Sequence, residues 1–291
     1  MGRAALDLNI GVSALSQQIA RLENELAIRL LQRTSRGVTP TSAGLAFYSQ
    51  AQLALRHADD AILAAREARL SGHVSVGMAP STASVLGVPF INAMRESYPD
   101  VRLHLVESLS GNLERMINTR LLDLAIVFQQ EKILRWSARP VLEERLFLIG
   151  THALLASLPD DPVSPDQLTT LPLIMPSQGH GLRGRLEAVC QQHNLSVEVV
   201  ADIDGLALLM QAVRSGLGAT LQPGAAISHL DHQALRVIGI ANPVLSRPNF
   251  LVSLSDDELT PAGLAARVIL SKVMRQLVES DRWPGATLYV N

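Results

Sequence analysis

The spacing of apolar residues in the first 26 positions is that of two short helices. Positions 4, 5 and 8 are apolar, residues 9–11 form a break that contains a glycine, and the following apolar residues step by four, three and four positions: Leu15, Ile19, Leu22 and Leu26. Such steps place side chains on one face of a helix. Two short helices joined by a tight turn predict a helix-turn-helix, whose second helix enters the DNA major groove. An ordinary helical hairpin would show the same spacing.

A basic hairpin is predicted after the second helix. Residues 30–33 and 38–39 form its strands, Arg36-Gly37 forms its turn, and Pro40 precedes a helix start at Thr41. A hairpin in this place is a wing, whose arginines would contact phosphates or the minor groove. The second helix adds polar side chains that can meet base edges. The candidate DNA-binding residues are therefore Ser13, Ser16, Gln17, Arg21, Arg33 and Arg36.

One long helix is predicted from Thr41 to Leu70, because no proline interrupts this stretch. Apolar residues recur in it at alternating steps of four and three, which is a heptad pattern: Phe47, Ala51, Ala54, Ala58, Ala61, Ala65 and Ala68. Small residues on such a seam let two helices approach closely, so we expect the helix to pair with a second copy. A single alanine-rich surface helix is the alternative.

Beyond residue 72, strands alternate with helices, a pattern typical of parallel strands covered by helices. It predicts two α/β lobes, with a late strand at 250–254 and a helix at 264–278 returning to the first lobe. The other predicted strands span 73–78, 101–106, 122–128, 145–150, 173–176, 196–201 and 219–221, and the helices span 81–97, 113–119, 182–193 and 206–215.

Charge and cysteine content narrow the class of protein. The first 70 residues hold eight arginines and six acidic residues, a net of +2 in a chain of 291 residues whose formal net charge is −2. A basic N-terminal unit suits a polyanion, although a solvated face carries charge in the same way. The single cysteine, Cys190, excludes a disulfide framework and a Cys-based zinc site, and it favours a reducing cytoplasm. The sequence has neither an apolar run long enough to span a membrane nor a secretory signal pattern.

The sequence lacks the common enzymatic motifs. It contains no P-loop, no dinucleotide-binding glycine motif, no nucleophile elbow and no paired-histidine zinc motif. The eight histidines are scattered. We therefore expect neither an enzymatic activity nor a cofactor or metal.

Four sequence strings have the order and spacing of one regulator family: ALSQQIARLENEL at 14–26, RTSRGVTPTSAG at 33–44, GHVSVGMAPSTAS at 72–84 and LLDLAIVF at 121–128. The chain resembles LysR-type transcriptional regulators over essentially its whole length, and most of all their nitrogen assimilation control branch. The resemblance implies an α plus α/β fold with a winged helix-turn-helix, a dimerising linker helix and a two-lobed effector domain similar to periplasmic binding proteins. We assign the winged helix-turn-helix to 1–40, the linker to 41–71 and the effector domain to 72–291, with lobe 1 at about 72–142 and 247–291 and lobe 2 at about 143–246.

The chain departs from the family pattern at two places. The family has a further helix before the position of Ala4, so either the start of this sequence is assigned too late or the DNA-binding unit lacks this helix. Without the helix, we expect the apolar face of the unit to lose cover. The family also commonly has Ser-Gln-Pro where this chain has Gly11-Val12-Ser13. Val12 cannot donate the amide hydrogen bonds that glutamine gives a base edge, although it can contact a thymine methyl group.

The resemblance also implies an effector site in the cleft between the lobes, where helix N-termini present free N–H groups. Arg183 and His180 are candidates to add positive charge there, although a surface position is the simpler interpretation of both. The serines and threonines of the site would equally serve as ordinary helix caps. The residues that the resemblance assigns to the effector are Ser81, Thr82, Ser110, Gln129, Ser177 and Thr220.

The sequence thus predicts a cytoplasmic transcriptional regulator that binds double-stranded promoter DNA as a homodimer or homotetramer. A small-molecule effector and RNA polymerase are its further expected partners, and a membrane is not. A small-molecule-binding or interaction protein that has lost DNA binding is the alternative. A periplasmic solute-binding protein is disfavoured by the missing signal pattern.

Overall fold

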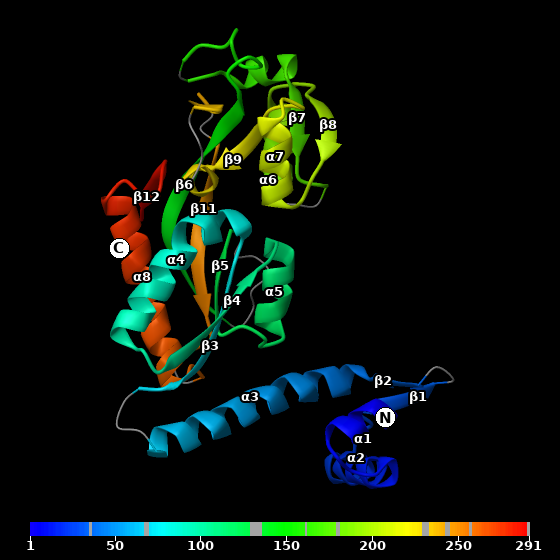
Figure 1. Cartoon of the computed structure of the whole chain (residues 1–291). Coiled ribbons are helices and arrows are strands. Elements are labelled where there is room, and N and C mark those ends of the chain that lie inside the picture. Colours follow the sequence, from blue (N-terminus) through cyan, green and yellow to red (C-terminus); the bar gives the residue numbers. More distant parts are fainter. Residues whose placement is uncertain are drawn as a thin grey trace. The chain divides into compact units, whose positions relative to one another are not determined.

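The chain forms two compact units, Met1–Ala61 and Ile62–Asn291, in the computed structural model (Figure 1). The structure describes residues 1–34, 37–66, 70–128, 136–160, 162–178, 181–228, 233–241, 245–255 and 258–289. None of the helices among these residues is long and apolar enough to cross a membrane.

The N-terminal unit begins with the predicted helix-turn-helix. Helix α1 (Gly2–Asp7) and helix α2 (Val12–Leu26) are joined by a tight turn in which Asn9 has a left-handed φ of 53°. The Ile10 amide donates to the Ala5 carbonyl at 3.0 Å and closes this turn. The residue after helix α2, Ala27, also has a left-handed backbone, a conformation that is common just beyond the C-terminus of a helix.

The wing follows as a two-stranded hairpin of β1 (Leu31–Thr34) and β2 (Gly37–Pro40). Glu23 of α2 accepts hydrogen bonds from the amides of Leu30 and Leu31, at 2.7 and 2.9 Å, and so attaches the hairpin to the helix. The predicted turn at Arg36-Gly37 is one residue too late, because Gly37 pairs with Thr34 as a strand residue. Gly37 has a φ of 130°, which glycine adopts at a strand end as readily as in a turn.

The predicted long helix is present as α3 (Ser42–Arg66), which Thr41 caps by accepting from the Gly44 amide at 3.0 Å. The first two residues of the predicted seam, Phe47 and Ala51, are half-buried, and the next two, Ala54 and Ala58, are exposed. The side chains of residues 61 and 65, and residue 68 altogether, lie outside the described part of the chain.

The C-terminal unit is built on a sheet in which eight strands are described, with the path β10-β6-β11-β5-β3-β4. As predicted, β3 (Gly72–Met78) pairs in parallel with β4 (Val101–Glu107) and β5 (Leu124–Val127). The expectation of parallel strands is wrong for β6 (Ser137–Thr151) and β11 (Ser246–Ser253), which are antiparallel to each other. The reason is that the chain passes into the second lobe on β6 and returns beside it on β11 (Figure 1).

Helices cover both faces of the sheet in the first lobe. Helix α4 (Pro80–Ser97) and helix α8 (Pro261–Glu279) pack together on one face, around buried residues such as Phe90 and Met274. Helix α5 (Ser110–Asn118) packs its Leu113 and Ile117 against β5 in a separate cluster. This core holds the first turn of α4 at the end of β3.

The second lobe contains two strand systems. Strands β9 (Thr220–Pro223) and β10 (Leu235–Gly239) pair with the later part of β6, and β7 (Pro172–Met175) pairs in parallel with β8 (Glu198–Asp202). The remaining elements are α6 (Gly181–Gln192), α7 (Leu206–Arg214), the short 3₁₀ helices η1 (Pro165–Thr170) and η2 (Gly224–Ile227), and β12 (Ala286–Leu288), which pairs with β6. Sequence periodicity missed β10, β12 and the first half of β6.

Candidate functional site

The polar face of α2 lies opposite its buried face. Leu15 is buried, whereas Ser13 and Gln17 are exposed and Ser16 is half-buried. Arg21 is 83% exposed and forms an ion pair with Glu25 at 2.9 Å. These side chains therefore lie at the surface of the N-terminal unit.

The wing supplies the other two predicted DNA-binding residues. Arg33 lies on β1, although its side chain is outside the described part of the chain, as is the whole of Arg36. The side of the wing that faces α2 lines a groove of about 510 Å³ together with helix residues such as Ile19 and Glu23.

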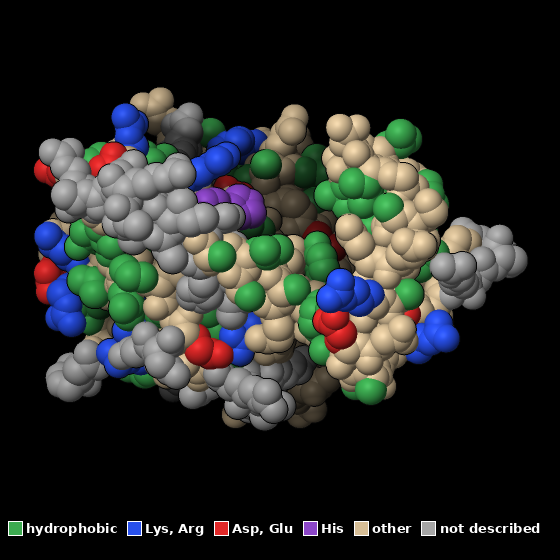
Figure 2. Space-filling model, turned by 90° about the horizontal axis from the view of Figure 1, so that it is seen from below, with side chains coloured by type: hydrophobic (Ala, Val, Ile, Leu, Met, Phe, Trp, Pro, Cys, Tyr) green, Lys and Arg blue, Asp and Glu red, His purple; other side chains and the backbone are tan. Residues whose placement is uncertain are grey.

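Part of the apolar surface of the helix-turn-helix is open to solvent. Leu8 is 60% exposed and Ile19 and Leu22 are half-buried, whereas Leu15 is buried. Leu6 and Val12 are exposed as well. On the face that Figure 2 shows, hydrophobic side chains reach the surface among polar and charged ones.

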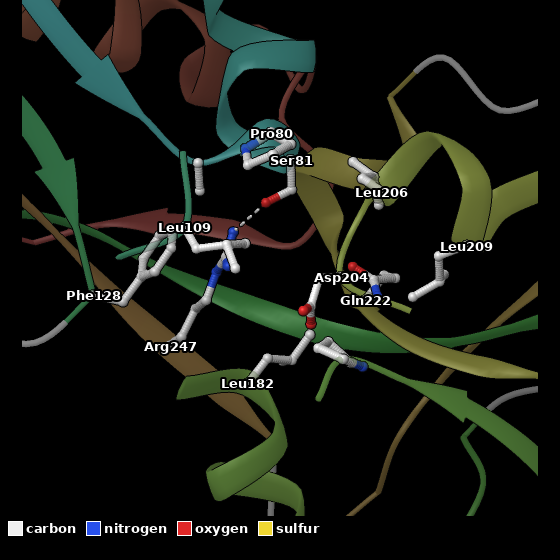
Figure 3. Close-up of a pocket in the computed structure, with 12 residues that line it drawn as sticks. Pro80, Ser81, Leu109, Phe128, Leu182, Asp204, Leu206, Leu209, Gln222 and Arg247 are labelled. Atoms are coloured by element: carbon white, nitrogen blue, oxygen red, sulfur yellow. Dashed lines mark hydrogen bonds between the residues drawn. The ribbon is translucent and has the colours of Figure 1, made fainter. Parts of the chain in front are cut away.

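A second candidate site is a pocket between the two lobes of the C-terminal unit (Figure 3). Its first wall comes from the start of α4, the ends of β4 and β5, and β11. Its second wall comes from β7, the starts of α6 and α7, and β9. The space left between the walls is narrow, about 30 Å³, which is room for about two water molecules. The lining residues are Ala79, Pro80, Ser81, Leu109, Phe128, Pro176, Leu182, Asp204, Leu206, Leu209, Gln222 and Arg247.

A buried cation lies in the first wall. Arg247 is 3% exposed; its Nε donates to Glu144 at 2.9 Å and its Nη2 donates to Ser81 Oγ at 3.0 Å. The guanidinium also lies 3.7 Å from the centre of the Phe128 ring, a favourable cation–π contact. Burial lowers the pKa of Arg247, and the charge of Glu144 opposes this shift. An arginine keeps its proton in proteins, so the pocket contains a permanent positive charge.

Glu144 joins the elements that meet where the lobes cross. It is fully buried on β6 and, besides Arg247, accepts from the Ala225 amide at 2.6 Å and from Trp283 Nε1 at 2.8 Å. The side chain of Asn249 is a fourth donor at 3.4 Å. These donors belong to η2, to β11 and to the turn that follows α8. One carboxylate therefore ties the return strand of the first lobe to a segment that leaves the second.

The structure brings one of the predicted effector residues, Ser81, into the lining of this pocket. Thr82 is fully buried and its hydroxyl has no hydrogen-bond partner among the described residues. Ser177 donates to Asp204 through both its amide and its hydroxyl, each at 2.9 Å. Ser110 begins α5, and the buried Thr220 accepts from Gln222 at 3.4 Å. Gln129 lies outside the described residues.

Arg183 takes no part in the pocket lining. It forms ion pairs with Glu187 at 2.7 Å and with Asp202 at 3.2 Å, and it lines a different depression beside Cys190. His180, the other candidate for added charge, lies outside the described residues. Among the residues that the structure describes, no group of three or more His, Cys, Asp or Glu side chains could hold a metal ion.

Sequence reasoning missed three charged and polar residues of the pocket lining: Arg247, Asp204 and Gln222. A signal for the first was present, because Arg247 and Asn249 interrupt the apolar strand that ends at Ser253. Charged residues in a buried strand require partners. No comparable signal marks Asp204, which lies in an exposed loop before α7.

Comparison with known proteins identifies both units. Residues 1–45 match the model of the bacterial regulatory helix-turn-helix proteins of the lysR family, and residues 67–275 match that of the LysR substrate binding domain. The nitrogen assimilation regulatory protein nac of Escherichia coli (strain K12) is 33% identical over 293 residues, covering 97% of this chain and 92% of that protein. The nac protein of Klebsiella aerogenes is 33% identical over 290 residues, covering 96% and 92%.

A solved structure confirms the fold. Full-length OxyR from Pseudomonas aeruginosa superposes with a TM-score of 0.74 at 20% sequence identity, and the match covers 100% of this chain and 93% of that chain. The likeness therefore extends over the helix-turn-helix, the long helix and the α/β unit.

Proposed function

Because the chain belongs to the LysR family of transcriptional regulators, and is thus a regulator rather than an enzyme, we propose that it binds double-stranded promoter DNA through α2 and the wing. The observation that carries this proposal is the exposed polar face of α2 beside a hairpin attached to it through Glu23. A recognition helix and a wing held in fixed relation can read the major groove and contact the adjacent backbone together.

The proposed DNA contacts divide by chemistry. Ser13, Ser16 and Gln17 meet base edges from α2, with Gln17 able to bond an adenine through both amide atoms. Arg21 contacts a phosphate, and Arg33 and Arg36 contact phosphates or the minor groove from the wing. Val12 at the start of α2 offers only an apolar contact.

The assembly that we propose uses α3 as the linker. Two chains pair along the seam that contains Ala54 and Ala58, and two such pairs form a tetramer through the effector domains. The domains are then 1–40 for the winged helix-turn-helix, 41–71 for the linker and 72–291 for the effector domain. We place this assembly in the cytoplasm, with RNA polymerase as a further partner.

The interlobe pocket is the proposed effector site. Ser81 at the start of α4 is the central contact, with Thr82, Ser110, Gln129, Ser177 and Thr220 around it. A ligand that binds one separation of the lobes more tightly than another would shift the C-terminal unit toward that arrangement. The free energy of this shift equals the difference between the binding free energies of the ligand for the two arrangements.

Two exposed glutamines on α2 test the proposed reading face. A residue advances by about 100° around a helix, so Gln17 lies opposite Leu15, whereas Gln18 lies near the edge of the buried face. We expect Gln17→Ala to weaken binding to a specific duplex by about tenfold and to change binding to unrelated DNA little, since base contacts carry the specificity. Gln18→Ala is the matched control.

The measurement is fluorescence anisotropy on both duplexes at one salt concentration. Equal affinities of the two variants for the specific duplex would show that α2 does not read DNA through this face. Wild-type chain that is folded but binds neither duplex would favour the second candidate function, a protein of this family that binds ligands or partners without gripping DNA. The observation that favours this second candidate is that apolar residues of the helix-turn-helix are exposed to solvent.

A further inference from the structure

A second hollow of the C-terminal unit is a groove along α8, where this helix lies beside β12 (Figure 1). The groove has a volume of about 690 Å³, and β6 and β11 supply the rest of its lining. It shares no lining residue with the interlobe pocket, and none of its lining residues belongs to the helix-turn-helix or the wing. Neither the proposed DNA contacts nor the proposed effector site therefore uses it.

The charged side chains that line this groove are all positive. Arg139 comes from β6, and Arg267, Lys272 and Arg275 come from α8. Among the described lining residues there is no aspartate or glutamate. The chain as a whole has a formal net charge of −2, so the groove is a local excess of positive charge. A hollow lined by charge of one sign attracts ligands of the opposite sign.

Three of these cations are available to an anionic partner. Arg139 and Lys272 are exposed, and neither forms a hydrogen bond or an ion pair with any residue that the structure describes. Arg275 pairs with Glu279 at 3.9 Å, but both side chains are more than half exposed, and such a pair contributes little free energy. A new carboxylate would therefore displace no strong interaction of these three side chains.

Apolar side chains lie among the cations. Leu251 is buried and Val141 and Leu288 are half-buried, whereas Val268 is 63% exposed on the same helix as three of the cations. A DNA backbone would use the charges of such a groove and leave its apolar surface uncovered, because phosphates and sugars are polar. A protein segment that carries both carboxylates and apolar side chains would use both parts.

The spread of the charges indicates the length of the partner. Arg267 and Arg275 are eight positions apart on α8, which is about 12 Å along a helix axis. One carboxylate or phosphate group cannot reach both ends of such a row, whereas about four residues of extended chain span it. The groove therefore suits a segment with several acidic residues better than a small anion.

We propose that this groove binds an acidic segment of a partner protein, whose carboxylates contact Arg139, Lys272 and Arg275 and whose apolar side chains cover Val268. This partner is additional to the promoter DNA and the effector of the proposed function. Complementary charges of this kind mainly increase the rate of association, so we expect binding to weaken as the salt concentration rises.

The test is fluorescence anisotropy of the full chain with a labelled peptide of alternating glutamate and leucine residues. About eight residues suffice, since an extended chain of that length is longer than the row of charges. One control peptide has serine in place of leucine, and the other has lysine in place of glutamate. We expect saturable binding of the first peptide, and binding about tenfold weaker or worse for each control.

The paired variants are Lys272→Glu and Arg95→Glu. Arg95 is an exposed cation of α4 that does not line the groove and has no bond to any described residue. Both substitutions change the net charge of the chain by the same amount. Lys272→Glu should weaken peptide binding by about fivefold, because an attraction becomes a repulsion, whereas Arg95→Glu should bind like the wild type. Thermal unfolding shows whether both variants are folded.

Three results would overturn the proposal: no saturable binding of the glutamate–leucine peptide, equal binding of either control peptide, or equal effects of the two variants. Binding of duplex DNA is measured on the same preparations. A loss of DNA binding in Lys272→Glu that parallels the loss of peptide binding would assign the groove to DNA and also overturn it. A chain that binds the peptide but no duplex keeps this partner class and loses the proposed function, whereas a chain that binds a duplex but no peptide does the reverse.

Discussion

Glu144 is a buried carboxylate that bonds to several elements of the effector domain. Its carboxylate is fully buried and compensates the buried charge of Arg247, while it also accepts from an amide of η2 and from the Trp283 indole. A buried ion pair contributes little net stability compared with apolar residues, but the loss of one partner leaves an uncompensated charge. Loss of the Glu144 charge would therefore leave the buried charge of Arg247 uncompensated and destabilise the fold.

The substitution Glu144→Gln tests this dependence with almost no change in shape. The amide oxygen can still accept hydrogen bonds, but the charge is lost and the amide N–H groups face the guanidinium. We expect the free energy of unfolding to fall by about 3–5 kcal/mol, as measured by urea denaturation. Glu96→Gln, at an exposed position of α4, is the control and should change it little. A loss below about 0.5 kcal/mol for Glu144→Gln would place it among ordinary surface substitutions and refute this role.

The same residues show why the pocket could not be fully predicted. The motif from Gly72 to Ser84 placed Ser81 correctly, because the start of a helix after a strand is a local feature of the sequence. The ion pair of Glu144 with Arg247 joins positions 103 residues apart. No local spacing encodes such a pair, and it exists only because β6 and β11 lie side by side.

At the scale of elements, periodicity predicted the helices well and the strand directions only in part. Helix α3 has the continuous period and the absence of proline that the sequence shows. The alternation of strands and helices correctly predicted parallel pairing of β3 with β4 and of β7 with β8. It could not predict the antiparallel pairing of β11, since a strand that returns from another lobe has the same residue pattern as one that enters.

Helix α3 carries a prediction of its own about assembly. Ala58 is exposed on the proposed pairing seam, and Ala46 is exposed on another side of the same helix. If two copies of α3 pair, Ala58→Glu places two like charges against each other and should weaken the dimer by at least tenfold, whereas Ala46→Glu should not. Light scattering across a concentration series measures this. An unchanged molar mass for Ala58→Glu at all concentrations would remove α3 from the interface.

At the scale of the whole molecule, the chain joins a small DNA-binding unit to a larger domain with an internal pocket. The two matched family models cover 1–45 and 67–275, so the helix-turn-helix match falls in the first compact unit and the substrate-binding match falls in the second. Two copies of such a unit on one axis would read a site with dyad symmetry. Electrostatic contacts supply much of the affinity in such complexes, and their number determines how strongly binding depends on salt.

The central claim is that this chain grips DNA specifically, and a salt series tests it most directly. The full chain is titrated by fluorescence anisotropy into labelled dyad-symmetric duplexes taken from the DNA upstream of its gene, with unlabelled unrelated DNA as competitor. We predict saturable binding to one of these duplexes that survives the competitor and weakens steeply, with a linear relation between the logarithms of affinity and salt concentration. A folded, oligomeric chain that binds every upstream duplex no better than unrelated DNA would contradict the claim.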